Sequence, residues 1–373
     1  MMAINQLPQL FNNRSHFVNV GKIGLDFAYE KVNLVQLGEL TSGELALKSV
    51  SSLPYSEGRE EFFLSPKEFK TKLRKAFHRC NFAGKKVVSS IPPSEVKTIS
   101  IHYKRQKENN NDSVIISAIK ERMDEDLSNY VIDYMPVRAN EKETDQLAIV
   151  ALVKKEIVTQ YLEIMRIAGL VVEALEIRPA AINRYIYSIL ENKENSNILS
   201  VNFGYEKSYL TITSGRRLLF DKKINIGSEK IISDISSALD IPSDTVTQLI
   251  ERHGFDSESK NTLKVVDLGE DYANTLIQIS RNTLENLIDE INRALLFSAS
   301  ENHGETIHKI YLLGNMSSWK GLDVYLSKNL NVNVEKIRDP LMRIEDPYEC
   351  ANDEILNTPE FSIAIGHALR GLV

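Results

Sequence analysis

The segment 26–31, Asp-Phe-Ala-Tyr-Glu-Lys, recurs almost unchanged as Asn-Phe-Gly-Tyr-Glu-Lys at 202–207. A short, mostly apolar run precedes each copy, at residues 23–25 and 198–201, and alternating apolar and polar residues follow it. This order predicts a strand, a tight turn and a second strand in both places. Two such hairpins, separated by 202 − 26 = 176 residues, predict a duplicated architecture in which one hairpin opens each half. Facing turns of this kind can hold phosphates between their backbone N–H groups.

The composition is that of an ordinary globular protein, with 42% hydrophobic and 26% charged residues. A chain of 373 residues is too long for one compact core, so we expect two or more domains. The formal net charge of −6 gives no reason to expect nucleic acid as the main partner. The basic stretch at 102–107 is more typical of a solvated loop. We therefore expect no nucleic-acid partner.

Cysteine usage and hydropathy indicate the compartment. Cys80 and Cys350 lie far apart with no partner spacing, which favours reduced thiols over a disulfide framework or a zinc site. Residues 1–11 lack the basic start and continuous apolar stretch of a signal peptide. The longest apolar run, 147–153, is far shorter than the roughly 20 residues of a membrane helix. The sequence therefore predicts a soluble, cytoplasmic protein.

Patterns of strands, helices and polar breaks divide the chain into four parts. These are a flexible N-terminal segment at 1–19, a first lobe at 20–95 plus 172–190, a small α+β module inserted at 96–171, and a second lobe at 198–373. Within the second lobe, residues 228–300 are predicted to form a helical subdomain beside the cleft. The polar segment 191–197 is the best candidate for a linker between the lobes.

Four further segments, in this order, suggest a family. They are 149–180, which contains Lys155-Glu156-Ile157-Val158 and Ala168-Gly169-Leu170, then 290–297, 310–314 and 364–372. With these segments the chain resembles the actin-like ATPase superfamily and, within it, the PilM-type proteins of type IV pilus assembly. The resemblance runs from about Gly21 to the last residues. It implies an α/β, ribonuclease-H-like duplicated fold with two lobes and an inserted subdomain. The MshI-type proteins of related pilus systems are a close variant that stays open.

The resemblance implies that ATP and Mg²⁺ bind between the lobes. The first turn would face the phosphates with Asp26, Phe27 and Ala28, and Asp26 would be the metal ligand. The second turn would face them from the other side with Asn202, Gly204 and Tyr205. The nucleoside would be approached by the remaining candidates, Gly227, Glu290, Arg293, Gly314 and Asn315.

Several positions depart from the family pattern. The first turn is usually rich in Gly and Ser, which lets amides approach a phosphate closely, but here residues 27–29 are bulkier. Asn202 stands where relatives have an Asp, and it lacks the charge that binds hydrated magnesium. The turn at 314–315 is Gly-Asn rather than Gly-Gly, and Thr247 and Ile250 stand where relatives carry a Glu and a Lys. We therefore expect weak or degenerate nucleotide binding, no hydrolysis and no catalytic residues.

The resemblance also implies a partner. PilM-type proteins hold the short cytoplasmic tail of PilN-type inner-membrane proteins, which contains an Ile-Asn-Leu-Leu-Pro-like stretch. This chain carries Ile4-Asn5-Gln6-Leu7-Pro8 before a polar segment at 12–15. One hypothesis is that residues 4–8 mimic the partner tail, in cis or on a neighbouring copy, with tethering raising the local concentration. The alternative is chance similarity in a disordered terminus.

Together these observations predict a cytoplasmic actin-like scaffold of a type IV pilus machine, peripheral at the inner membrane through its partner. The partner tail would lie as an extended peptide against the inserted module and the first lobe. Other pilus platform proteins and self-association are further expected contacts. Two alternatives stay open. One is a functional ATPase whose ATP binding and hydrolysis drive conformational change in the pilus machine, and the other is a sugar or acetate kinase of the same fold.

Overall fold

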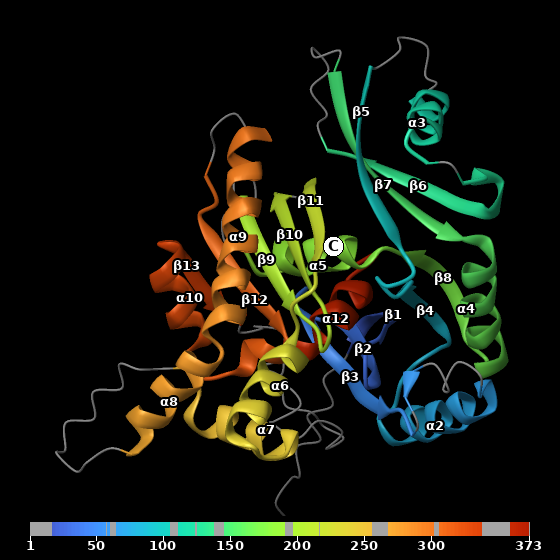
Figure 1. The fold of residues 1–373 in the computed structure, drawn as a ribbon. Helices are drawn as coiled ribbons and strands as arrows, with labels where there is room; N and C mark the ends of the chain where they lie inside the picture. The colour runs from blue at the N-terminus through green and yellow to red at the C-terminus, as the bar shows by residue number, and fades with distance from the viewer. Residues whose placement is uncertain are drawn as a thin grey trace, which may run out of the picture.

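The computed structural model describes most of the chain. The described residues are 17–56, 58–59, 65–104, 111–123, 125–137, 145–190, 197–215, 217–255, 268–301, 306–337 and 359–372. Residues 4–8, to which the tail-mimicry hypothesis refers, lie outside this part, as does Cys350. Three β-sheets organise the molecule (Figure 1).

The first sheet has the strand order β3-β2-β1-β4-β8. Its strands are β1 (Phe17–Phe27), β2 (Lys31–Leu40), β3 (Leu45–Pro54), β4 (Lys86–Ser90) and β8 (Val171–Glu176). Strands β1 to β3 form an antiparallel meander, and β4 and β8 continue from β1 in parallel. The predicted first hairpin is confirmed, because Phe27 pairs with Val32 across the turn.

The second sheet repeats this plan with the strand order β11-β10-β9-β12-β13. Its strands are β9 (Asn197–Phe203), β10 (Ser208–Ser214), β11 (Arg217–Ile224), β12 (Lys309–Gly314) and β13 (Asn333–Lys336). Again three antiparallel strands are followed by two parallel ones. Because both the order and the directions correspond, the duplication predicted from the twin hairpins is confirmed.

A third, antiparallel sheet has the order β5-β7-β6. In the sequence its strands come between β4 and β8, the last two strands of the first sheet. Its strands are β5 (Lys97–Lys104), β6 (Tyr130–Pro136) and β7 (Asp145–Lys154), and α3 (Asn111–Lys120) covers it. Apolar residues from both, among them Ile101, Ile119 and Val150, form a separate small core. Figure 1 shows this sheet as a distinct layer above α4.

Two helices pack in other cores than the sequence-based division predicts. Helix α4 (Lys155–Ala168), placed in the inserted module, packs instead on α2 (Pro66–Arg79) in the core of the first sheet. Its buried stripe faces α2, and Gly169 ends it in the left-handed conformation so that the chain enters β8 directly.

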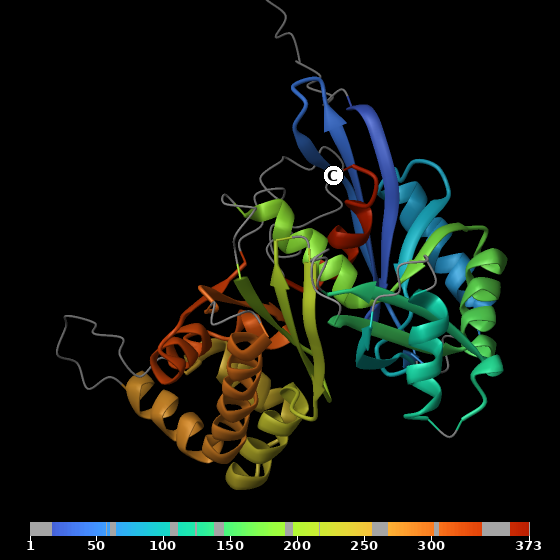
Figure 2. The same ribbon diagram turned by 90° about the horizontal axis from the view of Figure 1, so that it is seen from above.

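The second exception is α12 (Ser362–Ala368), which the division placed in the second lobe. It packs on β1 and on α5 (Arg178–Ile189), in a core shared with residues of both sheets. Figure 2 shows this red helix beside the blue strands of the first sheet. The chain therefore returns to the first lobe at its end, a long-range contact that carries no local pattern.

The remaining helices cover the second sheet and extend beyond it (Figure 1). They are α6 (Ser228–Leu239), α7 (Ser243–His253), α8 (Leu268–Ile279), α9 (Arg281–Glu301) and α10 (Leu322–Leu330), with the short 3₁₀ helix η2 (Asn315–Ser318). Two other 3₁₀ helices lie elsewhere, η1 (Leu127–Asn129) in the inserted module and η4 (Pro359–Phe361) directly before α12. Their apolar faces and the second sheet form the largest core. Within the described ranges, no helix combines the length and the apolar character needed to cross a membrane.

Candidate functional site

The tips of the two hairpins meet where the sheets approach each other. Tyr29, in the β1–β2 turn, stacks on Tyr205, in the β9–β10 turn, with ring centroids 4.8 Å apart and planes inclined by 19°. The Tyr29 hydroxyl donates to Glu206 Oε1 at 3.4 Å. Stacking at this separation is favourable for aromatic pairs. The two halves are therefore joined at the place where a phosphate clamp would need an opening.

A cavity of about 200 Å³ lies beside this aromatic contact. It is lined by eight of the eleven predicted site residues, namely Asp26, Phe27, Ala28, Asn202, Gly204, Tyr205, Gly314 and Asn315. The structure thus brings together residues from both hairpins and from the end of β12. Small-molecule pockets usually have volumes of roughly 300–1,000 Å³, so this cavity is small for a nucleotide.

Two of the predicted glycines allow backbone segments to pack closely. A Cβ on Gly227 would lie 2.0 Å from the Tyr205 carbonyl oxygen, so only glycine fits at this position. Gly227 itself does not line the cavity. Gly314 has φ +76°, and its Cβ would lie 2.0 Å from the Phe203 carbonyl oxygen. The N–H groups of Ser228 and Glu229, at the start of α6, donate to the second turn at 3.1 and 2.9 Å. These helix-end amides are consequently not available to a phosphate.

Side chains at the other predicted nucleoside positions are also engaged. Asn315 Nδ2 donates to Ser228 Oγ at 2.7 Å, which ties η2 to α6. Glu290 accepts from Lys222 Nζ and Arg293 Nη1, both at 2.7 Å. Neither Glu290 nor Arg293 lines the cavity. The structure therefore does not bring this pair to the site that the resemblance implied.

Arg178 is the main site residue that the sequence analysis missed. It lines the cavity, and its guanidinium carbon lies 4.0 Å from the centre of the Tyr209 ring. Its Nη2 is buried and has no hydrogen-bond partner among the residues that the structure describes. Burial lowers the pKa of Arg178, an effect that Tyr209, Asp26 and Asp221 oppose. The available signal was its position, because it directly follows β8 and begins α5, and ligands often bind beyond the carboxyl ends of parallel strands.

Asp26 lies among cations rather than beside a second carboxylate. The side chain is 6% exposed. Burial raises its pKa, whereas His367, Arg178 and Arg59 lower it. In the described part of the chain, no group of three or more His, Cys, Asp or Glu side chains could hold a metal ion. The neighbouring charges oppose the effect of burial without outweighing it, so the pKa of Asp26 stays raised.

Comparison with known proteins identifies the family. The family model described as type IV pilus assembly protein PilM matches residues 24–372. The chain belongs to the PilM family. A solved structure described as a PilM–PilN type IV pilus biogenesis complex is similar over 95% of this chain and 99% of that one, with 21% identity and a TM-score of 0.72. No curated protein sequence matches the chain.

A second solved structure shares the fold more distantly. It is the ethanolamine utilization protein EutJ from Carboxydothermus hydrogenoformans, with 10% identity, a TM-score of 0.54, and coverage of 94% of this chain and 89% of that one. The recognition of a PilM-type, actin-like α/β fold from sequence is thereby confirmed. The MshI-type variant stays a prediction.

The residues of this PilM-family site fit Mg²⁺-ATP poorly. Mg²⁺ is usually held by one or two carboxylates together with phosphate oxygens, but Asp26 faces Arg178 and Arg59, and Asn202 carries no charge. The tyrosine stack and the small cavity leave little room for a triphosphate. We derive no nucleotide chemistry from this arrangement.

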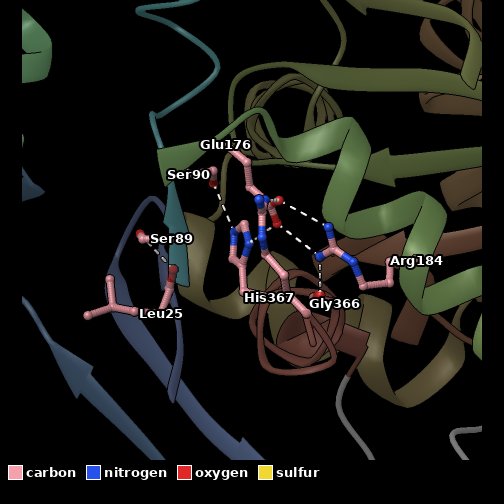
Figure 3. Close-up of polar contacts among 8 residues, drawn as sticks. Leu25, Ser89, Ser90, Glu176, Arg184, Gly366 and His367 are labelled. Carbon is pink, nitrogen blue, oxygen red and sulfur yellow. Dashed lines mark hydrogen bonds and ion pairs between the residues drawn. The ribbon is translucent and has the colours of Figure 1, made fainter. Parts of the chain in front are cut away.

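A buried polar network near the cavity fixes α12 (Figure 3). Glu176, at the end of β8, accepts from Arg184 at 2.9 and 3.0 Å, from Arg370 at 2.5 Å and from His367 Nδ1 at 2.9 Å. His367 is fully buried, and its Nε2 lies 3.1 Å from Ser90 Oγ. Burial alone would raise the pKa of Glu176, but the hydrogen bonds and charges of His367 and Arg184 lower it to about 2. The network therefore holds α12 on the first sheet.

Proposed function

We propose that this PilM-family chain is a cytoplasmic scaffold of a type IV pilus machine and holds the cytoplasmic tail of a PilN-type inner-membrane protein. The observation that carries the proposal is family membership over residues 24–372, together with likeness along almost the whole chain to a solved PilM–PilN complex. Such a scaffold is peripheral at the inner membrane through its partner. Other platform proteins and further copies of the chain are additional proposed contacts. The direct test of tail binding is titration with a peptide that carries the tail sequence.

An actin-like ATPase is the second candidate function. It is favoured by the convergence of both hairpins and the β12 end on one cavity between the lobes, with Asp26 and Asn202 in its wall. Against it stand the tyrosine stack, the small volume and the two guanidiniums that face Asp26. We therefore propose that nucleotide binding is weak or degenerate and that tail binding does not require it.

Thermal unfolding with Mg²⁺-ATP or Mg²⁺-ADP separates the two functions. A nucleotide at 100 times its dissociation constant would stabilise the protein by about 2.7 kcal/mol. With about 2.1 cal/mol/K of unfolding entropy per residue, this raises the Tm of a 373-residue chain by about 3 °C. We expect a shift below about 1 °C at millimolar nucleotide, measured against Mg²⁺ alone. A saturable rise near 3 °C would favour the ATPase.

A further inference from the structure

A second cavity, of about 270 Å³, lies on the other side of Arg178. It is formed where the three sheets meet, by residues at the end of β4, the start of β5, the β8–α5 junction and the strands β10 and β11. Arg178 and Tyr209 line both cavities and so stand between them. None of the eleven residues predicted to bind a nucleotide lines this second cavity.

The wall of the second cavity is strongly cationic. It includes Lys97, Arg178, Lys222 and Lys223, against a single acidic side chain, Asp221. Lys222 is paired with Glu290 at 2.7 Å, and Lys97 lies 3.7 Å from Glu125. Lys223 forms no ion pair with any residue that the structure describes. The pair of Lys97 with Glu125 is long and about half exposed on both sides, so it is weak. Arg178, Lys223 and Lys97 are consequently available to a ligand.

Strand register places the ligand-facing groups on one surface. Tyr209 pairs with Lys223, and Thr211 pairs with Asp221 on the neighbouring strand. Because alternate residues of a strand share a face, these four side chains lie on the same side of the β10–β11 ladder. Helix α5 contacts this ladder, with its first residue, Arg178, over the Tyr209 ring at 4.0 Å.

The buried Nη2 of Arg178 is the second, independent sign of a ligand. It donates to no acceptor in the described chain, and leaving a buried donor without a partner is unfavourable. Arg178 belongs to the first turn of α5, a helix of 12 residues, whose N-terminus also favours negative charge. An oxyanion supplies the missing acceptor through charge-assisted hydrogen bonds.

We propose that this second cavity binds the oxyanion of a small molecule, a phosphate or a carboxylate, between Arg178, Lys97 and Lys223. Lys97 belongs to the inserted sheet, Lys223 to the second sheet and Arg178 to the segment that follows the first. A bound anion therefore bridges all three sheets and stabilises the inserted module against the second lobe. The volume accommodates a substituent larger than the anion itself.

Asp221 gives anion binding a pH dependence. Burial raises its pKa to about 6, although the hydrogen bond from Thr211 and the charge of Arg178 lower it. The groups that face it are Arg178 on α5 and Thr211 and Tyr209 on β10, and Lys97 and Lys223 line the same cavity. Above about pH 6 the ionised carboxylate repels an anion. Affinity for the anion therefore rises as the pH falls through 6.

The test is calorimetric titration of the full chain with sulfate, which stands for phosphate, and with acetate. Both probes stay charged between about pH 5.5 and about pH 8, so any change in affinity reports on the protein. We expect saturable binding of at least one probe, with a lower dissociation constant at the lower pH. The probe that binds more tightly indicates whether the natural ligand carries a phosphate or a carboxylate. The Lys97→Gln/Lys223→Gln variant should weaken binding about tenfold, because it removes two charges from the wall.

Matched variants locate the bound anion. Lys207→Gln changes only the hairpin cavity, and Lys75→Gln changes an exposed lysine on α2, so neither should alter the affinity. Asp221→Asn should remove the pH dependence. The proposal is overturned if neither probe binds saturably, or if Lys97→Gln/Lys223→Gln binds like the wild type. Loss of binding in Lys207→Gln alone would place the anion in the hairpin cavity and equally overturn it.

Discussion

Replacing Glu176 with glutamine is expected to lower the free energy of unfolding at pH 7 by about 3 kcal/mol. The substitution keeps the size of the side chain but removes the charge that balances Arg184 and Arg370 and accepts from the buried His367. Breaking a buried ion pair usually costs about 3–5 kcal/mol. Because Arg370 is 45% exposed, we expect a loss of stability at the lower end of this range. For a chain of this length the Tm should fall by about 4 °C, measured by scanning calorimetry.

The same variant should also lose part of the wild-type acid sensitivity. The folded pKa of Glu176, about 2, lies below the ordinary value of 4.5. Its stabilisation is therefore complete above about pH 4.5 and disappears as the pH falls to about 2. The difference between wild type and Glu176→Gln should shrink over this range. Glu173→Gln is the control, because Glu173 pairs with Lys22 and Lys86 but is 36% exposed, so its loss should lower the free energy of unfolding far less than the loss of Glu176. A loss below about 0.5 kcal/mol for Glu176→Gln would contradict this account of α12.

Replacing Gly24 with alanine is expected to destabilise the protein by about 3 kcal/mol or more. Gly24 lies in the middle of β1, paired with Val35 on one side and Val88 on the other. A Cβ there would lie 1.9 Å from the Ala364 carbonyl oxygen and 2.5 Å from the Ala368 nitrogen. These are backbone atoms of α12, so the helix itself must move. Chemical denaturation should show the loss, together with weaker protection of α12 from amide exchange.

Gly21→Ala on the same strand is the matched control for Gly24→Ala. Its Cβ would approach the Leu372 side chain at 2.7 Å, a flexible end that can move aside, and the Leu37 carbonyl oxygen at 3.2 Å, a contact that a shift of a few tenths of an ångström relieves. We expect a change below about 1 kcal/mol. Equal effects of the two substitutions would mean that β1, rather than the close contact with α12, determines the cost.

The sequence was sufficient for the parts of the fold that repeat locally. The twin hairpins carry alternating patterns on both sides of a short turn, so strands and duplication could be predicted from short windows. Six of the eight site residues at the cavity meet because the two hairpins occupy equivalent places in two corresponding sheets, and Gly314 and Asn315 join them from the end of β12. This part of the site follows from symmetry and needs no knowledge of the packing.

Contacts between distant segments could not be predicted in the same way. The short apolar helix α12 is compatible with either core, and its choice depends on Gly24 and on the partners of Glu176. From the sequence, Arg178 lies between a predicted strand and a predicted helix, and its contact with the Tyr209 ring is a tertiary effect.

The aromatic residues of the two turns were predicted only in part. From the sequence alone, the phenylalanines and tyrosines of both turns are more readily interpreted as side chains that fill the cleft than as a stacking site. In the structure Phe27 packs into the first core against Tyr161, at 5.6 Å between ring centroids, and Phe203 is buried in the second. Tyr29 and Tyr205 instead stack on each other across the lobes. The repeated motif thus specifies one core residue and one contact between the lobes in each copy.

Tail binding, as proposed, does not depend on nucleotide. This independence is tested most directly by calorimetric titration of the full chain with a peptide that carries the cytoplasmic tail of the same organism's PilN-type protein. The titration is run without nucleotide and with millimolar Mg²⁺-ATP, and a scrambled peptide is the control. We predict saturable binding at one site, with dissociation constants that agree within about twofold, or about 0.4 kcal/mol. Absence of binding, or binding that appears only with Mg²⁺-ATP, would contradict the account.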